Sequence, residues 1–128
     1  MTNTPPVSKK AYWIGWVLSV IPGLLFLFSA SGKLIRNPAV TEGFEHLGWP
    51  ARYGFPIGVL ELVCTIVYLI PKTAVLGAIL MTGYLGGAIA THVRLGEPIY
   101  LHVAFGIIIW LGIFLRDPRL RELLPLRK

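Results

Sequence analysis

Glu61 and His92 are ionisable residues that lie within long apolar parts of the chain. Glu61 stands in the run GVLELVCTIVYLIP (residues 58–71), and His92 ends a segment rich in glycine and alanine. A charge inside a membrane is costly, so such groups are expected to face the protein interior and to have partners. Carboxylates and imidazoles suit proton transfer because protein environments can bring their pKa values towards neutrality. The sequence therefore predicts proton exchange between these two residues and a bound molecule.

Further polar side chains would lie near this pair. Lys33 and Arg94 are cations at the ends of apolar segments, and His102 lies near the start of another. Thr65 follows the acidic residue by one helical turn, and Thr91 directly precedes the histidine. We expect the two cations to stabilise negative charge on a ligand. The two threonines and His102 are expected to be additional ligand-binding groups.

Each of these residues also has an interpretation without a ligand. Lys33 and Arg94 would extend to lipid headgroups, as long basic side chains do at helix ends. Glu61 would form a structural ion pair with Lys33. His92 would make a structural hydrogen bond, and His102 would be an interfacial histidine without a function. The sequence leaves these alternatives open.

The composition predicts that these residues lie in a membrane protein. Of 128 residues, 55% are hydrophobic and 14% are charged, whereas a soluble domain carries about 25% charged residues. A membrane span needs roughly 20 mostly apolar residues, with about 17 as the lower limit. We therefore expect an all-α, four-helix transmembrane bundle forming one domain over residues 1–128. The four predicted spans are residues 12–31, 53–70, 73–93 and 99–115.

The basic residues predict the orientation of the spans. Eight Lys and Arg side chains lie beside the termini and the 70–73 turn, and four lie on the other side. Because cytoplasmic loops carry the excess of Lys and Arg, both termini and the basic tail 116–128 are expected in the cytoplasm. A cleaved signal peptide is the alternative for the first span, although its apolar run exceeds the usual signal core. The polar groups would then share the outer half of the bilayer.

Two short helices are expected outside the spans. Asn37 and Pro38 are typical of a helix start, and Gly48 of a helix end. This amphipathic helix would lie on the outer interface or fold over the bundle. Asp117 and Pro118 repeat the start signal after the fourth span. The leucines of the following tail, Leu120, Leu123 and Leu124, are expected to face the membrane.

Small residues recur every four positions in the third span and predict close helix packing. This broad face is formed by Ala74, Ala78, Thr82, Gly86 and Ala90, with Gly83, Gly87 and Thr91 beside it. The sequence does not decide whether part of the face joins a second copy of the chain.

Several function classes are disfavoured. The net charge of +6 comes from basic residues beside apolar runs, which favours an anionic lipid surface over nucleic acid. Cys64 is the lone cysteine, so the chain by itself cannot carry a Cys-x-x-Cys redox pair. No metal site is predicted, because two histidines and a glutamate from three helices lack a recognisable ligand spacing.

Four strings resemble the DoxX-like family of small bacterial membrane proteins. They are FSASGKL (28–34), GVLELVCTIVYLIPKTAVLGAIL (58–80), GYLGGAIATHVRLGEP (83–98) and WLGIFLRDPRLRELLP (110–125). The resemblance implies a four-helix integral membrane protein and an association with quinone-linked redox systems. It also matches family motif positions at Lys33, Glu61, His92 and Arg94.

These observations lead to three functional hypotheses. The first is a redox-associated protein of the bacterial inner membrane that binds a quinone or similar lipophile and meets a membrane oxidoreductase partner or its own copies. The second is a non-redox acid/base enzyme acting on a lipophilic substrate. The third is a non-catalytic assembly or anchoring subunit, in which the acidic residue fixes helix register.

Overall fold

The computed structural model describes residues 6–127, and every regular element in that range is helical. The α-helices are α1 (Lys9–Leu34), α2 (Pro38–His46), α3 (Gly54–Leu69), α4 (Ala74–Arg94), α5 (Tyr100–Arg116) and α6 (Pro118–Arg121). Two 3₁₀ turns, η1 (Ala51–Tyr53) and η2 (Pro71–Thr73), lead into α3 and α4. The expected all-α class is confirmed.

Length and apolarity divide the long helices into two groups. Within the described residues, three segments are long and apolar enough to cross a membrane: Lys9–Leu34, Ala51–Leu69 and Pro71–Arg94. Tyr100–Arg116 is a shorter apolar helix. The chain is thus helical, with several apolar helices suited to a bilayer.

The predicted helix starts outside the spans are confirmed by their caps. The Asn37 side chain accepts a hydrogen bond from the backbone N–H of Ala39, and Pro38 opens α2. The Asp117 side chain accepts from the N–H of Arg119 in the same way at the start of α6. Such caps satisfy backbone donors that lack a partner in the first turn.

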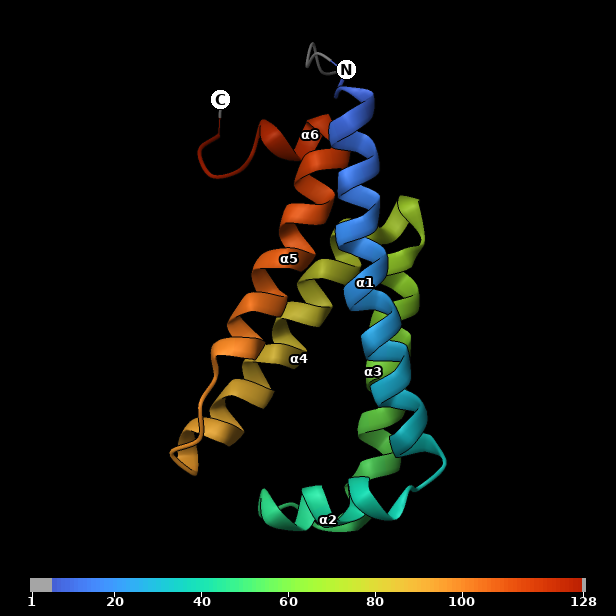
Figure 1. The fold of residues 1–128 in the computed structure, drawn as a ribbon, viewed down its shortest axis with the longest axis vertical. Helices are drawn as coiled ribbons and strands as arrows, with labels where there is room; N and C mark the ends of the chain where they lie inside the picture. Colours follow the sequence, from blue (N-terminus) through green and yellow to red (C-terminus); the bar gives the residue numbers. More distant parts are fainter. Residues whose placement is uncertain (1–5, 128) are drawn as a thin grey trace.

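The helices form two pairs that diverge towards one end (Figure 1). α1 has extensive contacts with both α3 and α5, α3 also packs on α4, and α4 lies along α5 with fewer contacts than these. The start of α1 and the end of α5 lie together at one end, and α2 crosses the opposite end, where the pairs separate. The bundle is therefore closed near its termini and open beneath α2.

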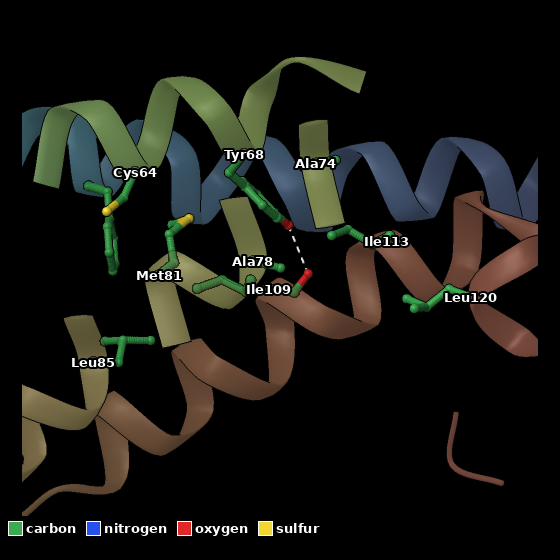
Figure 2. Close-up of a cluster of buried hydrophobic side chains, with 10 residues drawn as sticks. Cys64, Tyr68, Ala74, Ala78, Met81, Leu85, Ile109, Ile113 and Leu120 are labelled. Atoms are coloured by element: carbon green, nitrogen blue, oxygen red, sulfur yellow. Dashed lines mark hydrogen bonds between the residues drawn. The ribbon is translucent and has the colours of Figure 1, made fainter. Parts of the chain in front are cut away.

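The buried core fills the region where α3, α4 and α5 meet (Figure 2). The fully buried Tyr68 donates a hydrogen bond of 2.8 Å to the carbonyl oxygen of Ile109, which ties α3 to α5. Gly77 of α4 lies against the Tyr68 backbone, where a Cβ atom would clash. This contact needs glycine, so α3 and α4 pack closely at this point.

Two expectations from the sequence are wrong in part. The small-residue face of α4 is buried at Ala74 and Ala78, but Thr82, Gly86 and Ala90 are exposed. Thr82 and Gly86 line an open groove beside α5, which α5 does not fill. Leu120 does not face the membrane: it is 5% exposed and packs in the core. The other two leucines of that tail, Leu123 and Leu124, are exposed.

Candidate functional site

A pocket of about 520 Å³ lies between the diverging helix pairs, next to α2. Helices α1, α2, α3, α4 and α5 all contribute to its lining, together with the loop that follows α2. Most of the surface is apolar or aromatic; the walls include Leu25, Phe26, Phe44, Leu47, Trp49, Ile57, Leu60, Leu85 and Phe105. Pockets of this size and character are typical of small-molecule sites.

Lys33 and Glu61 form an ion pair at one wall of the pocket. The ammonium of Lys33 donates to Glu61 Oε1 at 2.9 Å and to Ser29 Oγ at 2.7 Å. The side chains of the pair are 12% and 3% exposed, respectively. Gly58 permits this approach of α1 to α3, because a Cβ there would lie 2.7 Å from the Cβ of Lys33. The carboxyl group at Glu61 is thus held inside the protein by a cation from a neighbouring helix.

Two further side chains surround Glu61. The Tyr84 side chain, from α4, interacts with the Glu61 carboxylate and also lines the pocket. Thr65 is buried, and its hydroxyl donates to the backbone carbonyl oxygen of Glu61 at 2.7 Å. This bond occupies the only hydrogen of the Thr65 hydroxyl, and Thr65 is outside the pocket lining.

His92 and His102 lie side by side at another wall, with ring centroids 4.5 Å apart. His92 Nδ1 lies 2.7 Å from the carbonyl oxygen of Ala88, one turn earlier on α4. A carbonyl oxygen only accepts, so Nδ1 must carry the hydrogen. Nε2 of neutral His92 is then a hydrogen-bond acceptor, and no partner among residues 6–127 occupies it. The buried Nδ1 of His102 also lacks a partner within that range.

Helix α2 and its following loop cover the open end of the bundle. Phe44 is 8% exposed and is part of the pocket lining. Three contacts join this segment to the end of α4 and the residues after it. His46 Nε2 pairs with Glu97 Oε2 at 3.1 Å, Trp49 Nε1 donates to Thr91 Oγ1 at 3.5 Å, and the Arg94 guanidinium donates to the Leu47 carbonyl oxygen. Of the two expected positions for this helix, folding over the bundle is the one observed.

The structure brings five of the seven predicted site residues to one pocket. Lys33, Glu61, Thr91, His92 and His102 all contribute to its lining. Thr65 and Arg94 do not: the first packs behind Glu61, and the second binds the α2 segment. The roles of all seven residues towards a ligand stay predictions.

The sequence interpretation missed three lining residues that carry polar groups: Ser29, Trp49 and Tyr84. Tyr84 lies on the same face of α4 as His92, two helical turns earlier, and this spacing could have identified it. Trp49 lies in the loop after α2, and no local pattern shows that this loop returns over the pocket. Within the described chain, no group of three or more His, Cys, Asp or Glu side chains is placed to hold a metal ion.

Comparison with known proteins gives one family match. A family model described as the DoxX-like family matches residues 17–115. The matched range includes every polar residue that lines the pocket. No curated protein and no solved structure matches the chain.

Proposed function

Because the chain belongs to the DoxX-like family, we propose that this membrane protein binds a quinone or a similar lipophile in the pocket beneath α2 and takes part in a redox system. The observation that carries the proposal is a mostly apolar cavity of about 520 Å³ with an ion pair and two histidines in its walls. A quinone ring needs apolar walls for its faces and polar groups for its oxygens. This pocket offers both.

The polar groups suit proton exchange with such a ring. Reduction of a quinone to a quinol takes up two electrons and two protons, and the reverse reaction releases them. Glu61 and His92 are the groups we assign to proton transfer, and Lys33 would stabilise negative charge on a ligand oxygen. The electrons would be exchanged with a membrane oxidoreductase, bound as a partner or met by diffusion.

We further propose the membrane setting that the basic residues favour. The helices α1, α3, α4 and α5 would each span the bacterial inner membrane, forming a single domain with both termini in the cytoplasm. The pocket would then lie in the outer half of the bilayer, beneath α2 at the periplasmic surface. A lipophilic ligand could enter it from the membrane.

Two neighbouring glycines of α4 provide a matched test of the pocket. Gly87 lines the pocket, Gly86 does not, and a Cβ atom at either position meets no neighbouring atom within 4 Å. Gly87→Leu should fill the pocket, whereas Gly86→Leu adds the same side chain outside it. The measurement is mass spectrometry of lipophiles retained by the purified protein. Quinone retained by wild type and Gly86→Leu, but lost by Gly87→Leu, is the expected result.

A second pair of variants tests the assigned acid. Glu61→Gln removes the carboxylate in the pocket, and Glu42→Gln makes the same change at an exposed position of α2 outside the lining. We expect quinone to be lost from the first variant and kept by the second. Equal quinone content in wild type, Glu61→Gln and Gly87→Leu would contradict the proposed site.

The ion pair also favours a second candidate function. Lys33 and Glu61 join α1 to α3, which is the contact expected of an assembly or anchoring subunit whose helix register must be fixed. In that case the pair would be needed for folding and complex formation but not for a ligand. Exchanging the charges of Lys33 and Glu61 separates the two functions.

A further inference from the structure

We propose that the pocket selects the reduced, dihydroxylated form of its ligand, so that it is a quinol site rather than a quinone site. This inference rests on the proposed function, because it names the redox form of the ligand class assigned above. The two forms have nearly the same ring and side chain. They differ in hydrogen bonding: quinone oxygens only accept, whereas quinol hydroxyls donate and accept.

His92 carries the selection. Its Nδ1 hydrogen is donated to the Ala88 carbonyl oxygen at 2.7 Å, which leaves the lone pair on Nε2 as the group available to a ligand. A quinone carbonyl oxygen facing that lone pair would find no hydrogen, and both acceptors would stay unpaired. A quinol hydroxyl would donate to it. An unpaired buried polar group lowers affinity much more than a formed hydrogen bond raises it.

Two other polar groups of the lining, the Thr91 hydroxyl and the Glu61 carboxylate, also have no hydrogen left to donate. The Thr91 hydroxyl donates to the Gly87 carbonyl oxygen at 2.9 Å and already accepts from Trp49 Nε1 at 3.5 Å. The Glu61 carboxylate, held as an ion pair with Lys33, has no hydrogen to give. His92, Thr91 and Glu61 therefore have no hydrogen to give to a quinone oxygen, and of the three only His92 Nε2 has no partner within residues 6–127.

The Lys33 wall accommodates either form. Two of the three ammonium hydrogens are donated to Ser29 Oγ and Glu61 Oε1, and the third remains for a ligand oxygen. A quinone carbonyl could accept it. A quinol hydroxyl could accept it too, while donating its own hydrogen to a carboxylate oxygen of Glu61. Discrimination is thus expected from His92, at the wall formed by α4 and α5.

The test compares three probes that share one shape. They are a short-chain 1,4-benzoquinone, its quinol, and the dimethyl ether of that quinol, which has no hydrogen to donate. Dissociation constants are measured under argon by isothermal titration calorimetry on the full chain in lipid nanodiscs. We expect the quinol to bind at least about tenfold more tightly than the quinone, and the ether to bind no better than the quinone.

A substitution at His92 tests whether this residue causes the preference for quinol over quinone. His92→Phe keeps a ring of similar size but removes the acceptor, so quinol and quinone should bind to this variant with about equal dissociation constants. Quinone binding by this variant shows that its pocket is folded.

The outcomes separate the two proposals. Quinone binding equal to or tighter than quinol binding would overturn the quinol selection and leave the proposed function standing. A quinol preference that survives in His92→Phe would overturn the role given to His92. Failure of all three probes to bind would overturn the proposed function, and the selection with it.

Discussion

At the scale of single residues, the central feature is the contact between Lys33 and Glu61. Nitrogen and oxygen lie 2.9 Å apart, and both side chains are largely buried. Desolvation makes each charge costly by itself, and the partner offsets that cost. The contact therefore makes the carboxylate tolerable in an apolar bundle, whether or not a ligand uses it.

Removing one partner should destabilise the protein more than removing both. Lys33→Met leaves an unpaired buried carboxylate, for which a loss of about 3–5 kcal/mol in the free energy of unfolding is typical. Adding Glu61→Gln to Lys33→Met should recover part of that loss, because no buried charge remains. Unfolding by SDS in mixed micelles, followed by circular dichroism, measures both. Strictly additive losses would show that the two side chains do not interact.

The exchanged pair, Lys33→Glu with Glu61→Lys, separates a structural role from a ligand role. It keeps one cation and one carboxylate in contact but moves each to the other helix. If the pair only fixes helix register, folding and complex formation should be restored. If the proposed ligand site is correct, folding should recover while quinone retention does not, because the carboxylate has moved from α3 to α1.

At the scale of helices, α4 uses similar residues for two different purposes. Gly77 allows the backbone of α3 to approach, whereas Gly83 and Gly87 leave the pocket open and have no neighbouring atom at a Cβ position. The same small side chains thus serve close packing at one end of the helix and an open cavity at the other.

Alanine substitutions should separate these two uses. Gly77→Ala places a methyl group against the Tyr68 backbone, and such overpacking costs about 1–3 kcal/mol. Gly86→Ala meets no neighbour within 4 Å and should stabilise α4 by up to about 1 kcal/mol, since alanine favours helices. Thermal unfolding in detergent measures the difference. A Gly77→Ala protein as stable as wild type would show that α3 and α4 do not pack closely there.

Short-range sequence signals predict where helices begin better than they predict how the helices pack against one another. Asn37 with Pro38, and Asp117 with Pro118, mark helix starts through contacts within three residues, so the sequence alone could place them. The four-residue repeat on α4 predicts close packing along the whole helix, because each position of the repeat carries a small side chain. Where the packing stops depends on how closely α5 approaches α4, since Thr82 and Gly86 line an open groove beside α5, and no spacing within α4 records that distance.

At the scale of the whole molecule, the polar groups gather where the bundle opens. Lys33, Glu61 and His92 come from three helices and lie at the α2 end, as the counting of residues along each predicted span implied. Counting residues along the spans could not predict that α2 covers the open end of the bundle. The contacts of α2 and its following loop with the end of α4 and the residues after it join positions 42 to 51 apart, such as His46 with Glu97, and no short-range pattern records them.

The proposed orientation can be tested by cysteine labelling, because the native Cys64 is buried. In a Cys64→Ala background, single cysteines replace Glu42, Lys72 or Arg119, which are all exposed. A membrane-impermeant maleimide should label position 42 in intact spheroplasts. Positions 72 and 119 should react only in inside-out vesicles.

Position 119 gives the most informative result of the three, because its labelling shows whether α5 crosses the membrane. That helix has 17 residues, which gives a length of about 26 Å against a hydrocarbon core of about 30 Å. Labelling of position 119 from outside would show that α5 does not cross the membrane. Labelling of position 72 from outside, with position 42 protected, would reverse the bundle and place the pocket on the cytoplasmic side. The expected pattern instead opens the pocket towards the periplasm, where a lipophile would exchange protons with the outer compartment.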